Sequence, residues 1–127
     1  MRTLRQSRGT HGEDLAVRHL EALHWRVIAR NVKVGPRDEI DLVAIDVSGE
    51  LVCVEVRSAR SGAFGAPEER VDGRKVSHLY RAAQAFVRSQ EARELGVGAH
   101  KARVDLVVVD MRGSKAVIRH LRRLEPA

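Results

Sequence analysis

Two acidic residues lie inside segments of the sequence that are otherwise apolar. Asp41 belongs to the run Ile40–Ile45, and Glu55 belongs to the run Leu51–Val56. Side chains alternate between the two faces of a strand, so each carboxylate shares its face with residues of the expected core. Removing a carboxylate from water costs several kcal/mol unless a cation or a proton compensates its charge. These two residues are therefore the first candidates for chemistry.

The short segment between the two runs predicts how the carboxylates meet. Val47-Ser48-Gly49 has the form of a three-residue hairpin turn with its glycine in the left-handed conformation. Asp46 then pairs with Glu50, and counting back along both strands places Asp41 opposite Glu55, with Cβ atoms about 4.5 to 5.5 Å apart. Facing carboxylates repel each other, and a bound divalent cation removes that repulsion. The pair therefore predicts a site for Mg²⁺ or Mn²⁺, which prefer oxygen ligands.

Two further oxygen donors complete the expected site. Glu13 lies on the apolar stripe of the first expected helix, which indicates that its side chain points toward the sheet. The carbonyl of Val56 adds a backbone oxygen, and an ion held in this way can activate water and neutralise the charge of a phosphodiester. Two other interpretations stay open. Glu13 could complete a capping box with Thr10, and either strand carboxylate could form a structural ion pair with Arg37 or Arg57.

Periodicity and turn signals predict the elements that position these residues. An apolar helical period predicts a helix over Glu13–His24, and a second helix with Asp72 as its N-cap follows a long surface loop over residues 58–71. The order α-β-β-β-α-β-β predicts an α/β protein of mixed (α+β) type, with a central mixed sheet flanked by helices. Besides the hairpin that carries the two carboxylates, the expected strands are Trp25–Val32, Val104–Val109 and Ala116–Leu121.

Length and charge narrow the possibilities further. A chain of 127 residues fits one domain, and we expect a flexible basic arm at residues 1–9, the domain at residues 10–122 and a C-terminal tail at residues 123–127. Lys and Arg number 23 against 17 Asp and Glu, which gives a net charge of +6. An arginine-rich basic surface suits phosphate, although the same charge would also serve solubility.

Several other classes of protein are not expected. The single cysteine, Cys53, excludes an intrachain disulfide, and its apolar neighbours are typical of a buried thiol. No apolar run approaches the roughly 20 residues that a membrane span needs, so we expect a cytoplasmic protein without a membrane partner. The histidines are scattered without the spacing of a zinc site, and zinc is not predicted.

The motifs around the two carboxylates resemble a known pattern. Asp41 and Val54-Glu55-Val56-Arg57 resemble the D-x(n)-E-x-K core of PD-(D/E)XK nucleases. Together the motifs look like the YraN-like uncharacterised family, which is similar in fold to archaeal Holliday-junction resolvases. The resemblance implies a restriction-endonuclease-like core and a metal held by Glu13, Asp41 and Glu55. It covers about residues 9–122 and includes Gly12-Glu13, Asp38-Glu39-Ile40-Asp41-Leu42-Val43, Phe64-Gly65, Lys75 and Arg103-Val104-Asp105-Leu106-Val107.

The chain departs from the nuclease pattern at one position. Arg57 stands where the resemblance implies a lysine, one residue beyond Val56. Arginine can hold a phosphate and stabilise charge in a transition state, but its pKa above about 12 excludes it as a general base. Lys75, near the start of the second helix, could supply an ammonium group from another element, and a solvent-facing lysine is the alternative. The candidate catalytic residues are thus Asp41, Glu55, Arg57 and Lys75.

Candidate nucleic-acid contacts surround this site. Phe64 lies in a glycine-flanked loop and could stack on or wedge between bases, or else pack onto its own domain. Asp105 interrupts a buried strand and could either support the site from behind its ligands or pair with Arg103; we expect the structural role. Three arginines could bind phosphates around the site: Arg57, Arg60 and Arg70.

The sequence thus predicts an endonuclease-like, Mg²⁺- or Mn²⁺-dependent protein that hydrolyses phosphodiesters with metal-activated water. DNA is a more expected substrate than RNA, and branched or repair intermediates are one class that the resemblance suggests. Two alternatives stay open. One is a non-catalytic nucleic-acid-binding module on a nuclease scaffold, which Arg57 favours, and the other is a protein-interaction domain with ion-paired carboxylates. A homodimer would suit two symmetric cuts in a junction, but the sequence shows no surface for one.

Overall fold

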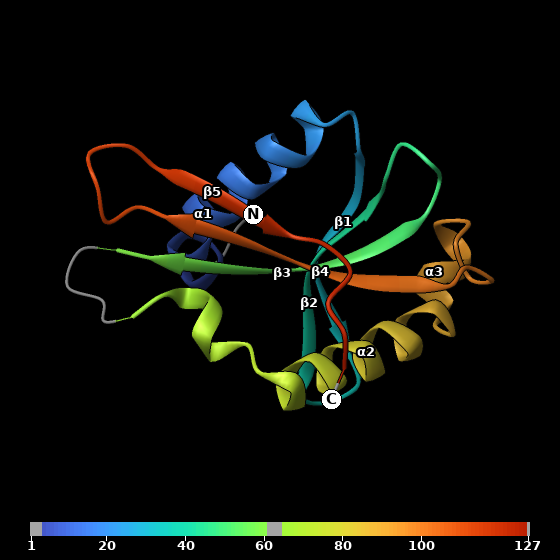
Figure 1. The fold of residues 1–127 in the computed structure, drawn as a ribbon. Helices are drawn as coiled ribbons and strands as arrows, with labels where there is room; N and C mark the ends of the chain where they lie inside the picture. The colour runs from blue at the N-terminus through green and yellow to red at the C-terminus, as the bar shows by residue number, and fades with distance from the viewer. Residues whose placement is uncertain (1–3, 61–64, 127) are drawn as a thin grey trace.

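The protein is built on one five-stranded sheet with a long helix on each side (Figure 1). The computed structural model describes residues 4–60 and 65–126, with the side chains of residues 11–60 and 65–126. Within these ranges no helix is long and apolar enough to cross a membrane. In chain order the elements are α1 (Leu4–Ala22), β1 (Arg26–Val34), β2 (Asp38–Ile45), β3 (Leu51–Ala59), the 3₁₀ helix η1 (Pro67–Arg70), α2 (Gly73–Val87), α3 (Gln90–Glu94), β4 (Ala102–Asp110) and β5 (Val117–Leu121).

The sheet is mixed, as the order of elements in the sequence predicted. Its strands lie in the order β1-β2-β3-β4-β5. β3 and β4 run parallel, and every other neighbouring pair is antiparallel. Because parallel strands need a long crossover connection, the chain leaves the sheet after β3 and returns to β4 through α2. The predicted fold class, a mixed α/β fold with the order α-β-β-β-α-β-β, is confirmed.

Two apolar cores hold the helices against opposite faces of the sheet. On one face, Ala16 and Leu20 of α1 pack against strand side chains that include Val52. On the other face α2 contributes Leu79 and Phe86. Burial of one large apolar side chain contributes roughly 1.5 to 3 kcal/mol, so each helix is docked mainly by this packing. Cys53 belongs to the α2 face, and its predicted burial is confirmed.

The first helix begins earlier than its sequence pattern indicated. α1 starts at Leu4, so residues 4–9, which we expected to form a loose arm, are helical. Thr10 and Glu13 therefore lie inside the helix rather than at its start. The predicted capping box is wrong, because a capping box requires its first residue to precede the helix. Glu13 therefore does not cap α1.

The predicted long loop is shorter than expected. β3 continues to Ala59, and η1 begins at Pro67, a residue type that suits the first turn of a helix. The short helix α3 was not predicted; the side chain of Ser89 caps it by accepting a hydrogen bond from the Ala92 N–H. α2 begins as expected, since the Asp72 carboxylate accepts a hydrogen bond from the Lys75 N–H.

The hairpin between β2 and β3 has the predicted turn. Gly49 adopts a φ of +89°, and its N–H donates to the Asp46 carbonyl at 3.0 Å. The Asp46 N–H donates to the carbonyl of Glu50 at 3.0 Å, so these two residues close the turn. The paired register then runs from Ile45 opposite Leu51 to Leu42 opposite Val54. Asp41 and Glu55 are the residues directly beyond the last of these pairs.

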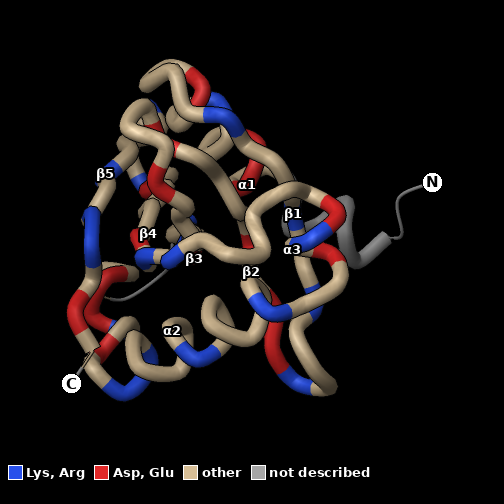
Figure 2. The backbone as a smooth tube through the Cα atoms, turned by 90° about the vertical axis from the view of Figure 1, so that its right-hand side faces the viewer, with Lys and Arg blue, Asp and Glu red and all other residues tan. Residues whose placement is uncertain are grey.

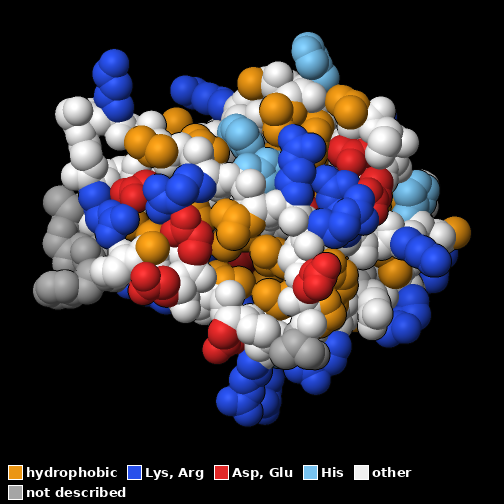
Figure 3. Space-filling model, viewed as in Figure 1, with side chains coloured by type: hydrophobic (Ala, Val, Ile, Leu, Met, Phe, Trp, Pro, Cys, Tyr) orange, Lys and Arg blue, Asp and Glu red, His pale blue; other side chains and the backbone are white. Residues whose placement is uncertain are grey.

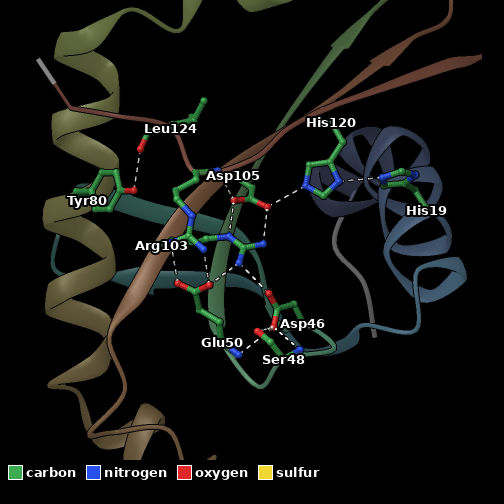
Figure 4. Close-up of polar contacts among 10 residues, drawn as sticks. His19, Asp46, Ser48, Glu50, Tyr80, Arg103, Asp105, His120 and Leu124 are labelled. Carbon is green, nitrogen blue, oxygen red and sulfur yellow. Dashed lines mark hydrogen bonds and ion pairs between the residues drawn. The ribbon is translucent and has the colours of Figure 1, made fainter.

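A buried polar network fixes this hairpin turn to β4 (Figure 4). The guanidinium of Arg103 donates to Asp105 at 2.9 Å, to Asp46 at 2.8 Å and to Glu50 at 2.6 Å. Asp105 has no solvent exposure, and its second oxygen lies 2.9 Å from His120 Nε2. These bonds hold the pKa of the Asp105 carboxyl below its ordinary value despite its burial. The structural role predicted for Asp105 is confirmed.

The same network reaches α1 and the C-terminal segment. His120 Nδ1 lies 3.0 Å from Nε2 of His19 on α1. The Leu124 N–H donates to the Val104 carbonyl at 2.8 Å, and the Tyr80 hydroxyl donates to the Leu124 carbonyl at 2.7 Å. The first part of the expected C-terminal tail is therefore bonded to the sheet and to α2.

Candidate functional site

The two strand carboxylates meet at the open end of the β2–β3 hairpin. Extension of the hairpin register by one pair places Asp41 opposite Glu55. One oxygen of Asp41 accepts a hydrogen bond from the Val56 N–H at 2.8 Å, which orients this carboxyl group along β3. Glu55 is 7% exposed. The sequence therefore predicted the meeting of the two groups from local turn geometry alone.

Asp41 lies in surroundings that disfavour its negative charge. Burial is the largest cause, followed by the charge of Glu55, and together with a smaller contribution from Glu13 these raise the pKa of Asp41 to about 8. The hydrogen bond from the Val56 N–H acts in the opposite direction. Two neighbouring carboxyl groups disfavour each other's negative charge. A cation bound beside Asp41 would relieve this repulsion.

Two basic side chains face Glu55 from different elements. Arg57 on β3 places a guanidinium nitrogen 2.8 Å from Glu55 Oε2, and the ammonium of Lys75 on α2 lies 3.8 Å from the same oxygen. The Lys75 side chain thus reaches the site, which sequence reasoning had left open. Arg57 Nε is buried without a hydrogen-bond partner among the described residues. An anion that approaches the site would meet both cations.

Glu13 approaches the pair from the other side of the sheet. Its carboxylate accepts a hydrogen bond from Asn31 Nδ2 at 3.1 Å and lies 3.7 Å from the guanidinium of Arg30. Gly12 lets α1 lie close to β3, because a Cβ at this position would clash with the Ser58 hydroxyl. Glu13 is near enough to affect the pKa of Asp41, but its hydrogen bond is to β1.

Asn31 has an unusual backbone conformation beside the site. Its φ is +53°, in the left-handed region, although it lies in the middle of β1. The pairs on either side are Arg30 with Leu42 and Val32 with Ile40, so Asn31 is opposite Asp41. Asparagine tolerates this conformation better than most residues. Sequence reasoning missed Asn31, because nothing in its neighbours indicates a left-handed residue within a strand.

The carboxylates lie in an open cleft between the sheet and α2. The cleft has a volume of about 370 Å³. Its wall includes groups that the sequence analysis did not select, chiefly Asp38 and His78, whose side chains lie 2.6 Å apart. One signal could have found His78: it follows Lys75 by one helical turn and so lies on the same face of α2. The lining residues are Arg37, Asp38, Glu39, Asp41, Glu55, Val56, Arg57, Lys75, His78, Leu79 and Ala82.

The oxygen donors suit Mg²⁺ or Mn²⁺ bound in an open site. They do not form a site in which protein ligands alone enclose the metal. Within the described part of the chain, no group of three or more His, Cys, Asp or Glu side chains is arranged to hold a metal ion. Mg²⁺ usually binds through one or two carboxylates and keeps several waters. The facing pair of Asp41 and Glu55 in an open cleft matches that requirement.

The predicted nucleic-acid contacts are only partly gathered here. Arg57 lines the cleft. Arg60 and Arg70 are exposed but do not line it. Phe64 lies outside the described residues, so its predicted stacking role stays a prediction.

Fold and site together define a mixed α/β protein in which the β2–β3 hairpin carries two acidic residues, Asp41 and Glu55, at the wall of an open cleft. The chain belongs to the uncharacterised protein family UPF0102, whose model matches residues 12–109. A UPF0102 protein of Pseudarthrobacter chlorophenolicus is 40% identical over 115 residues, which cover 90% of this chain and 82% of the relative. Another, of Moorella thermoacetica, is 38% identical over 109 residues, which cover 86% of this chain and 85% of the relative.

Solved structures give weaker likenesses. SfsA of Pyrococcus furiosus, in complex with Ca²⁺, has a TM-score of 0.36 and 14% identity over 97% of this chain and 64% of that protein. The crystal structure of SSO0001 has a TM-score of 0.32 and 15% identity over 91% of this chain and 52% of that protein. This chain therefore spans less than two thirds of either structure. The fold description rests on the strand order and helix placement given above.

Proposed function

We propose that this protein is a divalent-metal-dependent nuclease that hydrolyses phosphodiester bonds in DNA. The observation that carries the proposal is the facing pair Asp41 and Glu55 in an open cleft with basic groups at its wall. Burial and mutual repulsion raise the pKa of Asp41, and strongly perturbed carboxyl groups in clefts are typical of functional sites. The family resemblance supports a nuclease-type site at these positions.

Each residue of the cleft has a role in this proposal. Asp41 and Glu55 would hold Mg²⁺ or Mn²⁺, with the Val56 carbonyl and Glu13 as the further oxygens that the resemblance implies. When bound, such an ion activates water and neutralises phosphate charge. Arg57 would hold a phosphate oxygen of the substrate, because its planar guanidinium suits phosphate and cannot act as a base.

Lys75 would supply a second positive charge near the scissile phosphate. Its ammonium already lies beside Glu55, so a small rotation of a flexible side chain suffices to meet an anion. The cleft is open, which suits a polymeric substrate better than a small molecule that must be enclosed. Branched DNA and repair intermediates are the substrates that we would test first.

The test is cleavage of labelled duplex, single-stranded, flap and four-way-junction DNA with Mn²⁺. We expect the native protein to cut at least one substrate and Asp41→Asn or Asp41→Ala to lose at least about 100-fold in rate, because removal of a metal ligand should cost more than the roughly 10- to 100-fold lost with an outer-shell partner of a ligand. Asp38→Asn is the matched control, because Asp38 lines the same cleft but faces His78. Equal cutting by all these proteins would contradict the proposal.

A non-catalytic nucleic-acid-binding module is the second candidate, and Arg57 is the observation that favours it. If Arg57 marks a site that has lost catalysis, the native protein binds DNA without cutting it. Arg57→Lys restores the nuclease pattern at this position, so gain of cutting by this variant alone would support the second candidate. A protein-interaction domain, by contrast, predicts no salt-dependent affinity for DNA.

A further inference from the structure

One face of α2 carries arginines that have no acidic partner among the residues that the structure describes. Arg74, Arg81 and Arg88 are exposed and follow each other at seven-residue intervals, so they lie along one side of the helix and its C-cap. We call these three residues the arginine stripe. α2 itself contains no Asp or Glu, and Figure 2 shows its Lys and Arg positions along the backbone. The helix therefore presents uncompensated positive charge to solvent.

This lack of partners distinguishes the stripe from six of the thirteen other arginines whose side chains the structure describes. Across the described residues, no carboxylate lies within ion-pair distance of the stripe, whereas six other arginines pair with Asp or Glu. Arg81 has its guanidinium 3.2 Å from His78 Nδ1. The paired arginines are Arg30, Arg57, Arg103, Arg112, Arg119 and Arg123.

The stripe runs beside the candidate site. Lys75 and Ala82, which line the cleft, each follow a stripe residue by one position, so Arg74 and Arg81 flank the α2 wall of the cleft. Figure 3 shows Lys and Arg side chains along the lower right edge of the molecule, over α2. From Arg74 to Arg88 the helix rises roughly 21 Å, which matches about six nucleotide steps of one DNA strand. The next helix, α3, carries Glu91 and Glu94 together with Arg93, so its charge is mixed.

We propose that the arginine stripe binds the phosphate backbone of a nucleic acid and leads it along α2 to the cleft. Guanidinium groups bind phosphate oxygens through paired hydrogen bonds, and unpaired arginines do so without first breaking an internal ion pair. Such contacts read no base sequence, so the stripe sets position rather than sequence preference. This inference rests on the proposed function for its partner, a nucleic acid, but it concerns binding and not cleavage.

The test measures binding apart from cleavage. A fluorescein-labelled 30-base-pair duplex is titrated in EDTA at several salt concentrations, and anisotropy gives the affinity. The test variant replaces Arg74, Arg81 and Arg88 with Gln, which keeps good helix propensity. The control variant makes the same charge change at Arg18, Arg26 and Lys115, which are exposed and lie on α1, on β1 and in the β4–β5 connection. Circular dichroism melting checks that both variants fold.

We expect the test variant to lose at least about tenfold in affinity at 0.1 M salt. Its slope of log affinity against log salt should become shallower by about 2 to 3, since each lost phosphate contact contributes about 0.9. The control variant should change the slope by less than about 1. Equal losses in both variants, or no loss in either, would contradict the proposal that the stripe binds nucleic acid. Failure of the native protein to bind the duplex would contradict it as well.

Two further arms separate this inference from related ideas. Vesicles with anionic phospholipid are tested in place of DNA, and stripe-dependent binding to vesicles without binding to duplex would also overturn it. Cleavage with Mn²⁺ is measured separately. Loss of binding by the test variant supports the binding role of the stripe even if the native protein cuts nothing. The binding role and the proposed nuclease activity can therefore be refuted separately.

Discussion

Replacement of Asp41 by Asn should stabilise the metal-free protein while it removes the metal site. Asn keeps the shape of the side chain, and its carbonyl can still accept the hydrogen bond from the Val56 N–H. It carries no charge to repel Glu55. The pKa of Asp41 rises from the ordinary 3.8 to about 8, so ionisation of this group costs the folded state free energy.

The sign and size of the effect follow from linkage. A carboxyl whose pKa is raised on folding stabilises the protein fully below its unfolded pKa, and this contribution is lost as pH rises through the folded pKa. Asn does not titrate, so the advantage of Asp41→Asn should grow from near pH 4 to about pH 8. At about 1.4 kcal/mol per pKa unit, the gain at neutral pH is at most about 4 kcal/mol. We expect about 1 to 3 kcal/mol, because water in the open cleft reduces the repulsion.

The assay is urea unfolding of both proteins at pH 5 and pH 8 in EDTA. Asp38→Asn serves as the control, because the Asp38 carboxylate faces His78 rather than a second carboxylate, and it should give no gain that increases with pH. Added Mn²⁺ should raise the thermal midpoint of the native protein more than that of Asp41→Asn. If Asp41→Asn is no more stable than the native protein at pH 8, or its advantage is equal at the two pH values, the reasoning on facing carboxylates is refuted.

Three other predictions concern the scaffold. Gly49→Ala should destabilise the protein by about 1 kcal/mol in urea unfolding, because φ at this turn is +89°. Gly35→Ala, at φ +66° in the β1–β2 turn, should cost a similar amount. Unchanged stability at either position would contradict the assigned turns. Arg103→Met should cost about 3 to 5 kcal/mol, since it leaves the fully buried Asp105 without its main cation, while Arg123→Met at the exposed end of the network should cost under about 1 kcal/mol. The hydrogen bonds of Arg103 and its neighbours hold the pKa values of Asp46, Glu50 and Asp105 below their ordinary ones, so stability should fall as pH drops below about 4, and thermal midpoints that are flat between pH 5 and pH 3 would refute this.

The features that the sequence predicted well are those with local causes. The turn at Gly49 needs only one left-handed glycine, and the strand alternation on either side then fixes which residues face each other. Asp41 and Glu55 could be paired by counting for this reason. The N-cap at Asp72 is equally local, because its carboxylate bonds an N–H three residues later.

The features that were missed depend on contacts between distant segments. The segment before Glu13 shows little apolar periodicity, so the early start of α1 at Leu4 had no clear signal. The pair of His78 and Asp38 joins residues 40 positions apart, and it forms only because α2 crosses the face that carries β2. Whether Lys75 meets Glu55 is decided by the same crossing.

The charges around Glu55 explain why binding and cleavage must be measured separately. The pKa of Asp41 is raised, and Arg57 and Lys75 both face Glu55, so an anion that enters this part of the metal-free cleft meets two basic side chains. A phosphodiester can therefore approach without a divalent ion, guided by the arginine stripe on the same helix as Lys75. DNA binding in EDTA is expected under both candidate functions, so it does not discriminate between them. Only the dependence of cleavage on Mn²⁺ and on Asp41 separates a nuclease from a scaffold that binds nucleic acid without cutting it.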